Sequence, residues 1–166
     1  WMIMGYKEEF QESIEKPEYF WRKQAELIKW YEFPNNILSE DENGFYRWFK
    51  GGKLNTSYLL LDYHIECGRG DQTALIYDSP VTNTQSKFSF KELLEKVAKF
   101  AGLLRAKGIE KGDRAIIYMP MIPEALVAML ACARLGAIHS VVFGGFAPKE
   151  LAIRIDDAKP KILLTA

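Results

Sequence analysis

The sequence contains little cysteine and little histidine. Its 166 residues include two cysteines, Cys67 and Cys132, which allow at most one disulfide and form no CxxC pair. This content excludes a disulfide-rich secreted scaffold and favours a reducing, cytoplasm-like compartment. The two histidines, His64 and His139, have no Cys, Asp or Glu cluster at metal-ligand spacing around them, so no zinc site is expected.

The sequence also lacks an excess of charge of either sign and any long hydrophobic run. Lys plus Arg and Asp plus Glu each number 22, so no overall field attracts nucleic acid or an anionic membrane. The most apolar stretch, 125–133, is far shorter than the ~20 residues of a membrane helix. We expect a soluble protein without nucleic-acid or membrane partners, located in the cytoplasm. The mitochondrial matrix is the alternative, because a chain that starts at Trp1 can have lost a leader.

What the sequence does have is an aromatic N-terminal third. Residues 1–50 hold 13 of the 22 aromatic residues, including all four tryptophans. Pro17, Pro34 and a loop at 39–44 divide this segment into what we expect to be short helices of an arm. The aromatic side chains could form a stacking surface for bases or could fix the arm to a core. The second interpretation is favoured because basic residues are not interleaved with them.

From Thr73 onward the pattern is that of an α/β core. A short strand is predicted at 74–77, where turn residues follow. Ser89 and Glu92 then have the spacing of a capping box, and apolar residues recur at helical spacing up to Gly108.

Three strand candidates alternate with two helices in the last third. The strands are predicted at 115–119, 138–143 and 161–165, and the helices begin at Pro123 and Pro148. This βαβαβ order predicts an α/β fold that contains half of a doubly wound parallel sheet. His139 would be a core residue of a buried strand rather than a general base. Ligands of such sheets bind beyond the carboxyl ends of the strands, here the loops 120–123 and 144–148.

Gly144 and Gly145 are the best local candidate for a ligand contact. Without Cβ atoms, their backbone can approach a phosphate or a flat ring, and the N-terminus of the next helix is electropositive. The pair matches neither GxGxxG nor a P-loop, and a tight strand-to-helix turn explains the spacing equally well. No serine lies in a nucleophile motif, and Asp156 and Asp157 are expected on a solvated helix face.

Eight short motifs occur in order between Tyr6 and Ala166. They are RWF at 47–49, GGKLN at 51–55, LDYH at 61–64, IYDSPVT at 76–82, KGDR at 111–114, IYMPMIPEA at 117–125, MLACARLGA at 129–137 and VFGGF at 142–146. Together they resemble the short-chain acyl-CoA synthetases, the family of propionate–CoA ligase and acetyl-CoA synthetase. Residues 78–82 are more similar to the propionate-activating branch than to the acetate-activating one.

The resemblance implies a two-step ligase. A short-chain carboxylate, propionate rather than acetate, would attack ATP to give an acyl-adenylate and pyrophosphate, with Mg²⁺ accompanying the ATP. The thiol of coenzyme A would then displace AMP. Residues 1–70 would be the N-terminal cap, and residues 71–166 the truncated first part of the large AMP-binding (adenylate-forming) domain. Phe143, Gly144 and Gly145 correspond to the place where the family receives the nucleotide end of coenzyme A.

The motifs with which the family handles ATP do not occur in these residues. They are a Ser/Thr/Gly-rich phosphate loop, later acidic and aromatic motifs, and a lysine of a mobile C-terminal domain. We therefore expect no catalytic residue and no ligase activity in this chain alone, with the rest of its own chain and the small carboxylate as partners. The alternative is a non-catalytic α/β module that binds a nucleotide or docks on a protein. A half sheet leaves an open edge and apolar helix faces, so self-association of the isolated chain is also expected.

Overall fold

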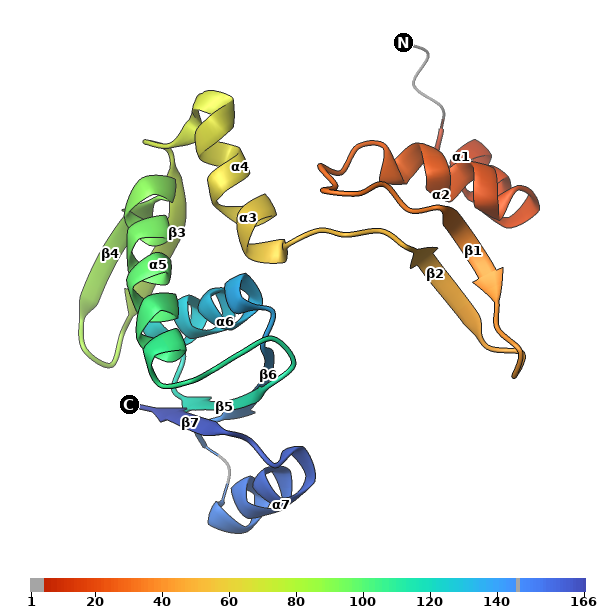
Figure 1. Ribbon diagram of the computed structural model, residues 1–166. Helices are drawn as coiled ribbons and strands as arrows, with labels where there is room; N and C mark the ends of the chain where they lie inside the picture. The colour runs from red at the N-terminus through yellow and green to blue at the C-terminus, as the bar shows by residue number, and fades with distance from the viewer. Residues whose placement is uncertain (1–4, 146) are drawn as a thin grey trace. The chain divides into compact units, whose positions relative to one another are not determined.

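The computed structural model describes residues 5–145 and 147–166, so Trp1 and Phe146 lie outside the described residues (Figure 1). The chain forms two compact units, residues 1–54 and 55–166. The division into a cap of residues 1–70 and an AMP-binding part from residue 71 stays a prediction.

From residue 5 onward, the N-terminal unit contains two helices and a β-hairpin. Helix α1 spans Tyr6–Glu15, α2 spans Pro17–Ala25, and the antiparallel strands β1 and β2 span Asn36–Glu40 and Tyr46–Lys50. The prediction of short helices is therefore wrong for residues 36–50. The reason is the turn at Asp41, whose Oδ1 accepts hydrogen bonds from the backbone N–H groups of Asn43 and Phe45, each at 3.0 Å. This turn folds the chain back into a hairpin.

Aromatic side chains join the helices of this unit to its hairpin. Trp21 on α2 meets Trp48 on β2 edge-on, with ring centroids 5.8 Å apart. Trp30 lies 5.7 Å from Phe49, and its indole N–H donates to the carbonyl of Ala25 at 2.8 Å. Among the described residues of the unit, the buried ones are Ala25, Pro34 and Ile37. The aromatic contacts thus compensate for a small core.

The C-terminal unit opens with short helices and a second hairpin. Its first elements are α3 (Thr56–Leu60), α4 (Asp62–His64), a π-helical turn (Ile65–Arg69), β3 (Thr73–Ser79) and β4 (Thr84–Ser89), the two strands pairing antiparallel. The sequence predicts β3 but misses β4, because TQSKFS is mostly polar.

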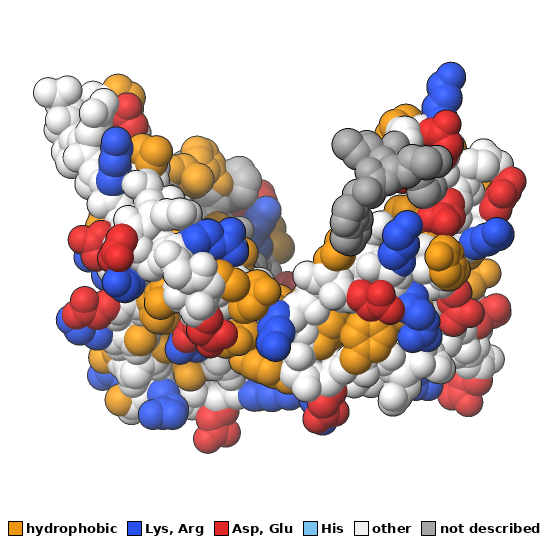
Figure 2. Space-filling view, turned by 90° about the horizontal axis from the view of Figure 1, so that it is seen from above, with side chains coloured by type: hydrophobic (Ala, Val, Ile, Leu, Met, Phe, Trp, Pro, Cys, Tyr) orange, Lys and Arg blue, Asp and Glu red, His pale blue; other side chains and the backbone are white. Residues whose placement is uncertain are grey.

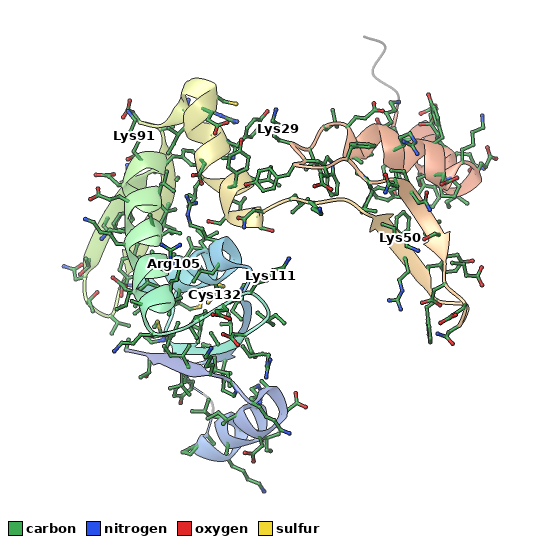
Figure 3. The ribbon with its side chains drawn as sticks, in the orientation of Figure 1. Lys29, Lys50, Lys91, Arg105, Lys111 and Cys132 are labelled. Carbon is green, nitrogen blue, oxygen red and sulfur yellow. The ribbon has the colours of Figure 1, made fainter. Side chains whose placement is uncertain are left out.

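Helix α5, Phe90–Ala106, begins at the predicted capping box. The Ser89 hydroxyl accepts the Glu92 N–H at 3.3 Å, and the Glu92 carboxylate accepts the Ser89 N–H at 2.8 Å. The capping box is therefore confirmed. In the same turn, Lys91, which Figure 3 labels, pairs with Asp71 at 2.9 Å.

A three-stranded parallel sheet completes the unit, in the strand order β6-β5-β7. Its elements are β5 (Arg114–Met119), α6 (Pro123–Leu135), β6 (Ile138–Phe143), α7 (Pro148–Ala158) and β7 (Ile162–Thr165). Helices α6 and α7 lie on opposite sides of the sheet (Figure 1). The predicted α/β fold with a βαβαβ half sheet is confirmed.

Helices α5 and α6 supply most of the core. On α5, Val97 and Leu104 are fully buried, and on α6 so is Cys132, which Figure 3 labels. Strand β6 differs from the buried strand that the sequence predicts. Val142 is buried but His139 is exposed, so the prediction of a core histidine is wrong. Because β6 is an edge strand of this sheet, less of it is covered than the apolar run suggests.

Charged side chains of both signs are interspersed over the face drawn in Figure 2. Hydrophobic side chains also reach that surface. Within the described ranges, no helix is both long enough and apolar enough to cross a bilayer.

Candidate functional site

The two predicted ligand loops lie side by side. Met119 at the end of β5 is in register with Phe143 at the end of β6, so the chain leaves both strands at the same edge of the sheet. The hydroxyl of Tyr118 donates a hydrogen bond of 3.2 Å to the carbonyl of Gly144. The loop after β6 is thereby held against the end of β5.

Gly144 and Gly145 are glycines for different reasons. Neither has a positive φ, so left-handed backbone is not the reason. A Cβ on Gly144 would lie 3.1 Å from the backbone C and O atoms of Met119, which belong to a paired strand. A Cβ on Gly145 would lie 2.7 Å from the ring of Phe143. Gly144 therefore lets the loop pack on the sheet, whereas Gly145 leaves room for an aromatic ring.

Phe143 is 57% exposed and borders an apolar cavity of about 530 Å³. The cavity lies within the C-terminal unit, between β3, the loop after β5, the first turns of α6, and β6. Its walls include Leu75, Met119, Ile122, Leu126, Met129 and Val141. Such a cavity can take a flat ring or an alkyl chain beside Phe143.

Helix α7 begins just after the diglycine. Pro148 occupies its first turn, and Ala147 at the N-cap offers no side-chain hydrogen bond. The first-turn N–H groups and the positive end of the helix dipole therefore have no side-chain cap. Glu150 in this turn pairs with Arg154 at 3.4 Å. An anionic group fits this end of the helix electrostatically.

The remaining polar candidates do not gather into a catalytic site. Asp156 and Asp157 are exposed near the end of α7, as predicted. Cys67 is exposed, Cys132 is buried and neither forms a disulfide; burial raises the pKa of the Cys132 thiol. Among residues 5–145 and 147–166, no group of three or more His, Cys, Asp or Glu side chains is placed to hold a metal ion.

The sequence analysis missed an ion pair between α4 and the end of α6. The Arg134 guanidinium donates to both carboxylate oxygens of Asp62, at 2.8 and 2.9 Å, and these hydrogen bonds hold the pKa of Asp62 below its ordinary value. Asn55 caps α3 and also donates to the carbonyl of Ala133 at 3.0 Å. The only sequence signal was that all three polar residues fall inside the quoted motifs. Tyr118 was also missed as a partner of Gly144.

The segment 78–82, on which the prediction of a propionate-activating enzyme rests, forms the end of β3 and the turn toward β4. Val81 is 93% exposed. Residues 80–83 form an exposed turn, whereas Asp78 borders a surface pocket together with Gln85 and Lys87.

Comparison with known proteins gives two adjoining family matches. Residues 65–166 match the model of the AMP-binding enzyme, and residues 6–60 match that of the acetyl-coenzyme A synthetase N-terminus. The human protein named acyl-CoA synthetase short-chain family member 3, mitochondrial, is 55% identical over 161 residues, which are 97% of this chain and 24% of the human one. An acetyl-coenzyme A synthetase of Magnetococcus marinus is 48% identical over 163 residues, 97% of this chain and 25% of that one.

A solved structure extends the comparison to the fold. Acetoacetyl-CoA synthetase from Streptomyces lividans matches with a TM-score of 0.88 and 29% identity, over 98% of this chain and 25% of that one. An uncharacterized protein of Pseudomonas aeruginosa is 61% identical over 163 residues, which are 98% of this chain and 26% of the Pseudomonas protein. This chain thus spans about a quarter of the length of the relatives that it matches. The resemblance to short-chain acyl-CoA synthetases is confirmed.

Proposed function

Because this chain belongs to the AMP-binding enzyme family, we propose that it is the N-terminal part of an AMP-forming acid–thiol ligase. A carboxylate oxygen attacks ATP, pyrophosphate leaves, and an acyl-adenylate forms. The sulfur of coenzyme A then attacks the acyl carbon, the thiol loses its proton, AMP leaves and a thioester forms. The observation that carries this proposal is the AMP-binding match over residues 65–166, directly preceded by the acetyl-coenzyme A synthetase N-terminal match.

The proposed acid substrate is propionate, with acetate as the alternative. Support for propionate comes from the resemblance of residues 78–82, and support for a short-chain acid comes from the names of the relatives. Mammalian proteins named short-chain family member 3 are 54–55% identical to this chain, whereas two acetyl-coenzyme A synthetases are 46% and 48% identical. This support is sequence similarity to relatives, because none of the described residues is assigned to a carboxylate pocket.

The proposed coenzyme A contact is the diglycine with Phe143. Two observations support it: a ring that is largely exposed, and a helix N-terminus without a side-chain cap. A nucleotide combines a flat base with phosphates, which matches an apolar cavity bordered by Phe143 and a positive helix end.

ATP and Mg²⁺ are assigned to parts of the protein outside these residues. The motifs with which the short-chain acyl-CoA synthetases handle ATP do not occur in these residues. We therefore propose that the 166 residues alone form no acyl-CoA, and that their partners are the remainder of the parent chain and a small carboxylate. The proposed location is the cytoplasm or, as for the relatives named mitochondrial, the mitochondrial matrix.

The reaction is tested with the complete protein. Purified enzyme is given ATP, Mg²⁺, coenzyme A and, in separate assays, propionate, acetate or butyrate, and the thioester and AMP are quantified. We expect equal amounts of thioester and AMP, with the highest kcat/KM for propionate. A higher kcat/KM for acetate would select the alternative substrate. Nucleotide binding without thioester formation from any acid would instead favour the non-catalytic module.

The coenzyme A contact is tested by Gly145→Val in the complete protein. The branched side chain displaces the Phe143 ring and narrows the approach to the backbone, so the KM for coenzyme A should rise more than the KM for ATP. Gly102→Val is the matched control, because a Cβ on this α5 glycine meets nothing within 4 Å. Equal increases of both KM values for Gly145→Val would indicate misfolding and contradict the assignment.

A further inference from the structure

The peptide unit between Gly144 and Gly145 is the least restrained kind of peptide in a chain. Both flanking residues lack a Cβ, so rotation of this peptide meets little steric resistance. A peptide that must present a fixed donor to a ligand therefore needs a restraint from outside the loop. The structure provides one in the 3.2 Å hydrogen bond from the Tyr118 hydroxyl to the Gly144 carbonyl.

The direction of this hydrogen bond determines where the next donor points. In a trans peptide, the C=O of one residue and the N–H of the next point in opposite directions. No peptide bond of the described chain is cis. Because the Gly144 carbonyl is directed at Tyr118, the N–H of Gly145 is directed away from it.

The position of Tyr118 suits this restraint. It lies on β5, one residue before the strand end on which Gly144 packs, and β5 is the central strand of the sheet. Ile116 and Ile117 of the same strand are fully buried, so the backbone that carries Tyr118 is fixed by the core. Strand β5 therefore contacts the loop twice, through the Met119 backbone and through the Tyr118 hydroxyl.

We propose that Tyr118 is a positioning residue for coenzyme A: its hydroxyl fixes the Gly144–Gly145 peptide so that the Gly145 N–H faces the cofactor. This inference rests on the proposed function, in which the diglycine receives the nucleotide end of coenzyme A. Tyr118 touches no reacting atom. Its effect is on the affinity for one substrate and not on the chemical step.

The test is Tyr118→Phe in the complete protein, which removes the hydroxyl and keeps the ring. The KM for coenzyme A should rise about three- to tenfold, the effect of losing one neutral hydrogen bond. The kcat and the KM values for ATP and the acid should stay within about twofold. A contact that binds coenzyme A equally well before and during the reaction affects only the KM for coenzyme A. Tyr58→Phe is the matched control, because its hydroxyl bonds Glu66 at 2.9 Å, in the α3 to π-turn region.

A second comparison separates failure of this inference from failure of the proposed function. If Gly145→Val raises the KM for coenzyme A and Tyr118→Phe does not, the cofactor contact stands and the role of Tyr118 is overturned. If neither variant changes this KM, the proposed coenzyme A contact itself is wrong. In the Gly145→Val background, Tyr118→Phe should add no further increase, because both changes disturb the same peptide; additive increases would overturn the inference.

Discussion

At the scale of single residues, the ion pair between Asp62 and Arg134 is well suited to a stability test. The two side chains are 22% and 31% exposed, and their hydrogen bonds are bidentate. We expect Asp62→Asn to lower the free energy of unfolding by about 1–2 kcal/mol at pH 7, measured by urea denaturation. Glu95→Gln, which breaks an exposed pair with Lys99, is the control and should lower the free energy of unfolding less than Asp62→Asn does.

The same pair predicts a pH dependence. Arg134 lowers the pKa of Asp62 in the folded state, so its stabilising contribution is complete above the unfolded pKa of about 3.9 and is lost as the pH falls through the folded pKa. The free energy of unfolding of the unmodified chain should therefore fall more steeply below about pH 5 than that of Asp62→Asn. Parallel curves for the two proteins would show that the carboxylate contributes nothing.

The diglycine gives a second comparison between residues. Gly144→Ala places a Cβ against strand backbone and should lower the free energy of unfolding by about 1–3 kcal/mol. Gly145→Ala meets the exposed Phe143 ring, which can turn away, and should cost less than Gly144→Ala. Thermal unfolding followed by circular dichroism compares the two, and an equal loss would contradict the distinct contacts described here.

The diglycine was predictable as a candidate site because two adjacent residues without Cβ atoms follow a strand and precede a helix. Its partner Tyr118 was not predictable, because 26 positions separate the two ends of their hydrogen bond and only the register of β5 and β6 brings them together. His139 was misjudged for a related reason. Alternation along a strand says which residues share a face and not whether anything covers that face.

At the scale of elements, the capping box of α5 is the clearest local signal in the sequence. Ser89→Ala removes the oxygen that accepts the Glu92 N–H and should lower the free energy of unfolding by about 1 kcal/mol. Ser86→Ala on the neighbouring strand β4 serves as the control, since it lies outside any helix cap. Urea denaturation of the two variants compares them, and equal stabilities would show that the cap is not needed once α5 is packed.

The elements that the sequence predicted are those with strong local or periodic signals. Helices α5 and α6 and the three parallel strands have long apolar repeats and defined ends. The hairpin at 36–50 was missed because its aromatic residues resemble the spacing of the preceding helices. The signal that could have found it is the Asp-Glu-Asn-Gly turn at 41–44 between two short apolar runs. Strand β4 has no such signal and is found only through its pairing with β3.

At the scale of the whole molecule, the two units differ in how much they bury. The C-terminal unit has a continuous core around α5 and α6, whereas the described buried residues of the N-terminal unit are Ala25, Pro34 and Ile37. Small units with little buried apolar area are marginally stable. We therefore expect the 166-residue chain to unfold in two steps, with the N-terminal unit unfolding at the lower urea concentration.

All four tryptophans lie within residues 1–50, so tryptophan emission of this chain reports on the N-terminal unit. Far-UV circular dichroism is dominated by α5, α6 and α7 in the other unit. The emission transition should precede the dichroism transition. Ile37→Ala should move only the emission midpoint and Val97→Ala only the dichroism midpoint, because each removes a buried side chain from one unit. Coincident transitions that move together in both variants would mean that the chain unfolds as a single cooperative unit.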